Sequence, residues 1–213
     1  MTATGFLTAV FGPRDAVLDG VLRHSLLEQG MPTIMVDDVG GRVLEFLTRL
    51  KQPKRILEIG TLFGYSTIYL ARGLQPGGLV TTLEQDSVAA ALARENFERA
   101  GVAERINLTV GDAVEYLVEM ESESVDMVFI DGDKRAYPTY LKHAIRILAP
   151  GGVLVADDAY ADYGASADDV FDGAERAGVH TYNLAVGRST QLFSAVLGTR
   201  NGMLASIKLP GGA

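Results

Sequence analysis

The sequence predicts an α/β fold, in which a mostly parallel central sheet is flanked by helices and ends in an antiparallel hairpin. From Arg55 onward, short runs rich in β-branched residues alternate with segments of helical periodicity. This alternation is typical of right-handed βαβ units around a parallel sheet. Near the end, two apolar runs flank Asn201-Gly202, and an Asn-Gly pair in that position is a strong signal for a hairpin.

Two helices are expected before the first strand. Apolar residues recur at helical spacing over 17–27, and Gly30 would end this first helix. The second helix would begin after Asp37 or Asp38 as its N-cap and end before Pro53. Its apolar face is expected to comprise Val39, Val43, Phe46, Leu47 and Leu50.

The remaining elements follow in regular order. The expected strands of the parallel part are 55–60, 79–85, 106–110, 125–131 and 153–158. The expected helices between them are 66–72, 87–100, 113–119 and 138–148, and a last helix over 173–186 precedes hairpin strands 192–198 and 203–209. No repeat or linker interrupts the 213 residues, so one domain over 1–213 is expected, with N-terminal helices over 1–52 and a sheet core over 53–213.

The composition argues against several classes of protein. Nineteen basic and 27 acidic side chains give a net charge of -8, the wrong sign for binding nucleic acid. The sequence contains no cysteine, which excludes thiolate nucleophiles and cysteine-held metal centres and suits a reducing compartment. The N-terminus lacks a basic start, and no window approaches the roughly 18–20 apolar residues that span a bilayer. A cytoplasmic protein without a membrane partner is expected.

The densest functional signal follows the first expected strand. Residues 58–66 read E-I-G-T-L-F-G-Y-S, and glycines at the end of a strand let the backbone approach a ligand. A dinucleotide fingerprint would need glycine at Leu62, whereas Gly60 and Gly64 are four residues apart. The acid Glu58 suits a ligand that carries an ammonium and a sulfonium group, as S-adenosylmethionine does.

Two later strand ends carry residues for the same ligand. Glu84 closes the second strand, where doubly wound folds place a carboxylate that accepts ribose hydroxyls. Gly111, Asp112 and Ala113 follow the third strand and could flank an adenine. Each match alone could be an ordinary loop glycine or a solvated acid, but three matches at successive strand ends favour a ligand site.

Acidic residues follow the fourth and fifth strands. Asp131 ends the fourth, and Asp157 and Asp158 end the fifth. Like charges this close repel unless a cation lies among them, and oxygen ligands favour magnesium, calcium or manganese over zinc. The alternative is that the Asp-Asp pair only forms a turn or caps a helix.

Lys134 lies one helical step from Asp131. A divalent ion can hold a hydroxyl oxygen and lower its pKa, and Lys134 could then take the proton. An ordinary lysine, with a pKa of about 10.4, needs desolvation or nearby positive charge to act as a base. The alternative is a solvated lysine at a helix start.

At these residues the chain resembles the cation-dependent O-methyltransferases, the family of catechol and caffeoyl-CoA O-methyltransferases and many small bacterial relatives. The resemblance runs from about residue 31 to 208. It is most specific in E-I-G-T-x-x-G-Y-S over 58–66, F-I-D-x-D-K-x-x-Y over 129–137, and P-G-G over 150–152, before the fifth strand. It implies a Rossmann-like class I methyltransferase fold and, as is usual for bacterial members, a homodimer paired through the N-terminal helices and the hairpin.

The resemblance also implies roles for single residues. Glu58, Gly60 and Ser66 would hold the amino acid part of S-adenosylmethionine. The full expected cofactor site is Met35, Val36, Glu58, Gly60, Gly64, Tyr65, Ser66, Glu84, Gly111, Asp112, Ala113, Asp131 and Tyr137. Asp131, Asp157 and Asp158 would bind the metal, and Lys134 with Asp131 would be catalytic. The family usually has Asp-Asn after the fifth strand, so Asp158 keeps an oxygen ligand but adds a negative charge.

The expected reaction is an in-line transfer of the sulfonium methyl to a hydroxyl of a small molecule. A vicinal diol on an aromatic ring would chelate the ion, so a catechol-like acceptor is expected. The loop 159–168 would supply its walls, with Tyr160 and Tyr163 as stacking rings, although such tyrosines also pack at ordinary loop boundaries.

Several other functions stay open at this stage. Other acceptors or metal-independent chemistry would suit the same fold, and so would a binding protein that retains the cofactor pocket without catalysis. An NAD-dependent oxidoreductase is disfavoured by the spacing of Gly60 and Gly64. Nitrogen methylation of nucleic acids commonly uses N-P-P-Y or D-P-P-Y after the fourth strand, where this chain has Asp131-Gly132-Asp133-Lys134.

Overall fold

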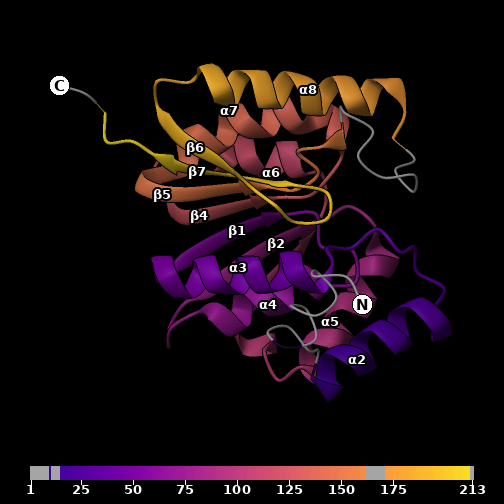
Figure 1. Ribbon diagram of the computed structural model, residues 1–213. Helices are drawn as coiled ribbons and strands as arrows, with labels where there is room; N and C mark the ends of the chain where they lie inside the picture. Colours follow the sequence, from indigo (N-terminus) through magenta and orange to yellow (C-terminus); the bar gives the residue numbers. More distant parts are fainter. Residues whose placement is uncertain (1–9, 11–14, 162–170, 212–213) are drawn as a thin grey trace.

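A seven-stranded sheet forms the centre of the computed structural model, which describes residues 10, 15–161 and 171–211 (Figure 1). Its strand order is β3-β2-β1-β4-β5-β7-β6, with β1 to β5 parallel and β7 antiparallel to both β5 and β6. The strands are β1 (Arg55–Ile59), β2 (Leu79–Glu84), β3 (Ile106–Val110), β4 (Val125–Ile130), β5 (Leu148–Ala156), β6 (Leu192–Leu197) and β7 (Met203–Lys208). The predicted parallel sheet with a C-terminal hairpin is confirmed.

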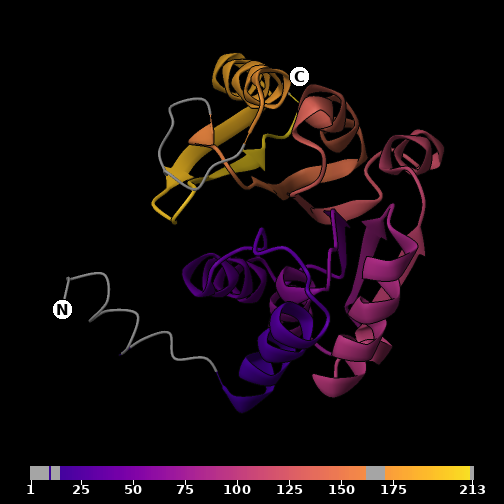
Figure 2. The ribbon, with the colours of Figure 1, turned by 90° about the vertical axis from the view of Figure 1, so that its right-hand side faces the viewer.

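Helices cover both faces of the sheet (Figure 2). One face carries α2 (Ala16–Leu22), the π-helical turn η1 (Arg23–Glu28), α3 (Asp38–Lys51), α4 (Tyr65–Gly73) and α5 (Ser87–Arg99). The other carries α6 (Ala113–Glu119), α7 (Tyr137–Ile147) and α8 (Gly173–Arg188), and short 3-10 turns occur at η2 (Ala103–Arg105) and η3 (Lys134–Ala136). None of the described helices combines the length and the apolar character that crossing a membrane would require.

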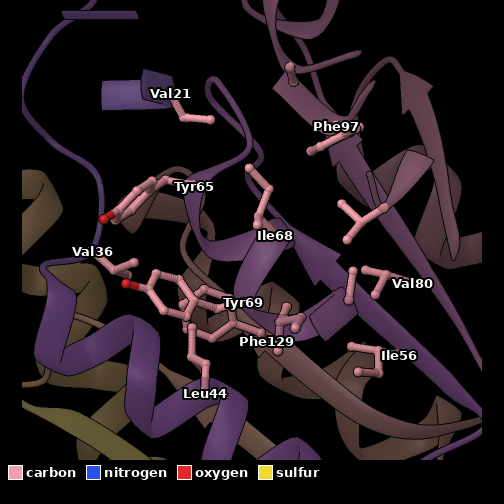
Figure 3. Close-up of a cluster of buried hydrophobic side chains, with 14 of the residues drawn as sticks. Val21, Val36, Leu44, Ile56, Tyr65, Ile68, Tyr69, Val80, Phe97 and Phe129 are labelled. Carbon is pink, nitrogen blue, oxygen red and sulfur yellow. The ribbon is translucent and has the colours of Figure 1, made fainter. Parts of the chain in front are cut away.

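Alternate side chains of the central parallel strands enter two separate cores. In β1, Ile56 joins the cluster under α3, α4 and α5 (Figure 3), whereas Leu57 joins the cluster under α6, α7 and α8. In β4, Phe129 and Val128 divide in the same way. Burial on both faces explains why these strands read as continuous apolar runs in the sequence.

The first expected helix is interrupted by a π-helical turn. α2 ends at Leu22 and η1 follows, so the residues after 22 are rotated relative to a continuous α-helix. Ser25 is consequently buried, whereas Leu27, expected on the apolar face, is 80% exposed. The prediction of one regular amphipathic helix was therefore wrong in its second half.

α3 packs with a different face from the one expected. Its N-cap is Asp37, whose carboxylate accepts a hydrogen bond from the Gly40 amide at 2.7 Å, as predicted. Small residues and Leu44 form its buried face: Gly40, Gly41, Leu44 and Thr48. An added Cβ at Gly41 would lie 2.3 Å from the Tyr69 ring, so α4 approaches too closely for a larger residue. Two residues of the expected apolar face, Phe46 and Leu50, remain 64% and 71% exposed.

The fifth strand begins earlier than the sequence indicates. α7 ends at Ile147 and β5 starts at Leu148, so the P-G-G run lies within β5 and not before it. An irregular register between Val125 and Met127 of the neighbouring β4 accommodates these residues.

Candidate functional site

A cavity of about 620 Å³ lies at the carboxyl ends of the parallel strands. Residues that follow β1, β2, β3, β4 and β5 line it, together with the segment before α3, the start of α8 and the tip of the β6–β7 hairpin. This is where open α/β sheets bind ligands, and the volume falls in the range of roughly 300–1,000 Å³ that is usual for ligand sites.

The loop after β1 is fixed by close backbone contacts. Gly60 has a φ of +93°, and an added Cβ would lie 2.3 Å from the Asp131 carbonyl oxygen. Leu62 also has a positive φ, of 50°, which is uncommon for a residue with a branched side chain. Both the Thr61 and Leu62 amides donate to Glu84 Oε2, at 3.1 and 2.7 Å. Glu84 thus ties the loop to the end of β2 while it lines the cavity.

Glu58, for which the sequence implies a contact with the cofactor, lies beneath the cavity and does not line it. It is fully buried and accepts hydrogen bonds from Ser66 Oγ at 2.7 Å, Thr67 Oγ1 at 2.5 Å and Thr82 Oγ1 at 2.7 Å. Burial raises its pKa to about 7 despite these three donors. Glu58 therefore joins β1, β2 and α4, and it holds Ser66, which does reach the cavity.

Most other expected cofactor residues line the cavity. They are Met35, Gly60, Tyr65, Ser66, Glu84, Gly111, Asp112, Ala113 and Asp131. Three do not, for different packing reasons. Val36 is buried in the hydrophobic core, and Gly64 lies against Phe97, whose ring would be 2.3 Å from an added Cβ. Tyr137 is fully buried behind Lys134, where its hydroxyl contacts Lys134 Nζ at 3.0 Å.

The three aspartates converge at one edge of the cavity. One carboxylate oxygen from each of Asp131, Asp157 and Asp158 lies within 4.8 Å of the others. Burial raises the pKa of Asp131 to about 6, although Lys134 opposes the rise, and burial together with the other two carboxylates raises the pKa of Asp157 well above its usual value. The sequence expectation that these residues meet at adjacent strand ends is confirmed.

Lys134 lies between two of these carboxylates. Its Nζ is 2.7 Å from Asp131 Oδ1 and 2.7 Å from Asp158 Oδ2. Burial alone would lower the pKa of Lys134, but the surrounding oxygens raise it well above the ordinary value. The negative charge around Nζ outweighs the effect of its desolvation, so only added positive charge nearby would lower this pKa.

α8 holds Lys134 from behind. An added Cβ at Gly178 would lie 2.1 Å from the Lys134 carbonyl oxygen, so glycine permits the helix to pack directly on η3. At the start of α8, Arg135 forms ion pairs with Asp172 and Glu175. The lysine therefore projects from a turn that is fixed on both sides.

Comparison with known proteins assigns the chain to a family. A model of the O-methyltransferase family matches residues 14–209. The chain belongs to this family. It is 38% identical over 177 residues to a catechol O-methyltransferase of Niastella koreensis, covering 82% of this chain and 80% of that protein. It is 44% identical over 128 residues to a catechol O-methyltransferase of Mycobacterium tuberculosis, covering 60% of this chain and 58% of that protein.

A solved structure supports the same assignment. The O-methyltransferase of Bacillus cereus in complex with S-adenosylhomocysteine (SAH) superposes with a TM-score of 0.85 at 30% identity, covering 96% of each chain. The protein is an S-adenosylmethionine-dependent O-methyltransferase with the class I fold, and the cavity at the strand ends lies where such folds bind their cofactor.

The cavity is also lined by residues that the sequence did not indicate. Phe171 and the hairpin tip Thr199, Arg200 and Asn201 line it. The Asn-Gly pair predicts the turn but not its position beside the aspartates, which depends on the pairing of β7 with β5. Tyr160, expected as a stacking wall, packs instead over Gly202, and Tyr163 lies outside the described residues.

Proposed function

We propose that this methyltransferase transfers the methyl group of S-adenosylmethionine to a hydroxyl of a small catechol-like acceptor, with a divalent cation held by Asp131, Asp157 and Asp158. The products would be SAH and a methyl ether. The observation that carries the proposal is the convergence of three carboxylates within 4.8 Å at the edge of the cofactor cavity.

The donor set suits a hard cation. All three groups are carboxylates, and oxygen ligands favour magnesium, calcium or manganese. Asp157 and Asp158 are each 6% exposed, and so little water leaves their mutual repulsion poorly screened. A bound cation would offset that repulsion, and it would lower the pKa of an acceptor hydroxyl held beside it.

The charge of the cavity suits the cofactor. Among the residues that the structure describes, eight carboxylate side chains line it, against Lys134 and Arg200 as the cationic ones. This excess of negative charge favours a ligand with a sulfonium and an ammonium group over one with phosphates. Ser66 and Met35 would contact the methionine part of the cofactor, and Glu84 would accept the ribose hydroxyls, which leaves Gly111, Asp112 and Ala113 for the adenine.

Lys134 is the proposed base. Its Nζ is held at the cavity by Asp131 and Asp158, and these charges keep it protonated. Once a bound cation neutralises the two carboxylates, the main cause of the raised pKa is removed. Nζ can then accept the proton of the acceptor hydroxyl as the oxygen attacks the methyl group.

The acceptor class follows from the cluster and its apolar wall. A ring with two adjacent hydroxyls could approach the cluster through both oxygens while its face lies against Phe171, whose ring centroid is 6.0 Å from Lys134 Nζ. The two catechol O-methyltransferases among the relatives support the same class.

The test is methyl transfer from labelled S-adenosylmethionine to matched catechols and monohydroxy phenols, with magnesium, calcium or manganese and with chelator. We expect transfer to catechols only, lost with chelator and restored by metal. Lys134→Ala and Asp131→Ala should each lower kcat by roughly two orders of magnitude or more, as expected for loss of general base or metal activation. Equal turnover in chelator would exclude the metal, and equal turnover of monohydroxy phenols would exclude chelation of the acceptor.

We also propose that two copies of the methyltransferase pair through α3 and the hairpin. Phe46 and Leu50 of α3 are largely exposed, and so are Phe193 of β6 at 67% and Ile207 of β7 at 45%. Phe193 and Ile207 are register partners, and Ile207 shares a face with Met203, which contacts α3 at Gly40. The four side chains therefore lie on the same side of the sheet, and a second copy of this apolar surface would cover them.

A further inference from the structure

The tip of the β6–β7 hairpin reaches the acidic cluster through one side chain. Asn201 Nδ2 donates a hydrogen bond to Asp158 Oδ1 at 2.8 Å, and the other oxygen of Asp158 contacts Lys134 Nζ at 2.7 Å. Both oxygens of this carboxylate are thus oriented by donors, one being Lys134 after β4 and the other Asn201 of the hairpin. Asn201 itself lines the cavity.

The backbone of the hairpin tip is held firmly at this place. The Ala159 amide donates to the Gly202 carbonyl at 2.8 Å, and the Tyr160 amide donates to the Asn201 carbonyl at 3.0 Å. Gly202 has a φ of +75°, and an added Cβ would lie 2.8 Å from the Tyr160 ring. Asn201 therefore extends from a turn that is tied directly to the residues after Asp158.

Position 158 combines a left-handed backbone conformation with a side chain that has a hydrogen-bonding partner in the hairpin. Asp158 has a φ of 60°, in the left-handed region that aspartate and asparagine tolerate better than most residues. A carboxylate there needs a donor from position 201, and the Asn201 amide supplies it. An amide at 158 could instead donate to an acceptor at 201. The pair needs opposite hydrogen-bonding roles at the two positions.

We propose that Asn201 is a positioning residue of this methyltransferase: it sets the orientation of the Asp158 carboxylate, so that the acidic end of the cavity is completed by a matched Asp158–Asn201 pair. This rests on the metal dependence proposed above. In this proposal the hairpin contributes to metal affinity through Asn201, in addition to the aspartates that follow β4 and β5.

The test measures manganese binding by electron spin resonance of the free ion, and SAH binding by calorimetry, on the intact protein. Asn201→Ala removes the donor without adding charge, and it should weaken manganese binding roughly 10- to 100-fold, as is typical when a group that orients a ligand is lost. The exchanged pair Asp158→Asn with Asn201→Asp should recover most of the affinity, because the amide at 158 then donates to the carboxylate at 201. SAH binding should not change in either variant.

A matched control separates positioning from general loosening of the turn. Asn183 Nδ2 donates to the Ala159 carbonyl at 2.9 Å without touching the aspartates, so Asn183→Ala should leave manganese affinity unchanged. Asn201→Leu, which removes the donor at a similar side-chain size, gives the same comparison if Asn201→Ala does not fold. Failure of the exchanged pair to recover affinity, or parallel loss of SAH binding, would overturn the inference alone. Absence of manganese binding by the unaltered protein would overturn the proposed metal dependence as well.

Discussion

Two glycines with positive φ, one in the cofactor loop and one between α4 and β2, differ sharply in what they tolerate. Gly60 and Gly77 both have positive φ, of +93° and +83°, but an added Cβ at Gly77 meets nothing within 4 Å. Gly77→Ala should therefore cost only the backbone strain, about 1–2 kcal/mol. Gly60→Ala should cost more and abolish SAH binding, because it displaces the Asp131 carbonyl. Urea unfolding and calorimetric SAH titration of both variants check this; equal effects would contradict it.

Glu58 should make stability depend on pH. Its pKa is near 4.5 when unfolded and about 7 when folded. Below about pH 4.5 both states are protonated, and as pH rises to 7 the unfolded state ionises while the folded state keeps its proton. The carboxyl contribution to stability is thus lost over this range, by roughly 3 kcal/mol. The free energy of unfolding of the unaltered protein, measured relative to that of Glu58→Gln, should fall between pH 4.5 and 7. Parallel pH profiles of the two proteins would contradict this prediction.

For single residues, the sequence predicts which strand end a residue occupies better than it predicts which way the side chain points. Glu58 and Tyr137 belong to the right motifs, yet both side chains point into the protein, where they hold Ser66 and Lys134. Periodicity and motif spacing place residues at a strand end, but the side that faces the cavity depends on packing with helices distant in the sequence. Phe171 and Asn201 were missed for the same reason.

Among the elements, most strands and helices follow their sequence patterns, and the exceptions arise from tertiary packing. The π-helical turn η1 brings Ser25 against α5, where Asn96 Nδ2 donates to Ser25 Oγ and to the Phe63 carbonyl, both at 2.9 Å. Asn96 is fully buried and thereby joins the N-terminal helix to the cofactor loop. Apolar spacing carries no information about such a buried amide.

This junction can be tested with a matched pair of amides. Asn96→Leu leaves the buried Ser25 hydroxyl and Phe63 carbonyl unpaired, at about 1–3 kcal/mol for each group. The same change at Asn107, which is exposed on the edge strand β3, should have little effect. Thermal unfolding should show a marked drop in Tm for Asn96→Leu only. A similar Tm for both variants would mean that Asn96 does not stabilise the junction.

For the whole molecule, the exposed side of α3 predicts self-association. Phe46→Glu should convert the proposed dimer into a monomer, because it places a charge in an apolar surface that would otherwise be buried. Val88→Glu is the control, since Val88 is 71% exposed at the start of α5, away from this surface. Sedimentation equilibrium decides the matter: a monomeric unaltered protein, or a dimer that survives Phe46→Glu, would contradict the proposal.

The contact between the hairpin tip and Asp158 also bears on the order in which the protein becomes competent during synthesis. The cofactor loop, β1 to β4 and Lys134 emerge from the ribosome first, but the Asp158 carboxylate gains its Asn201 partner only when β7 has paired with β5. Contacts between segments so far apart in sequence form late. A nascent chain whose last two strands are still inside the ribosome therefore lacks this contact at the acidic end of the cavity. If the proposed metal site is required, we expect methyl transfer to begin only after β7 has paired with β5.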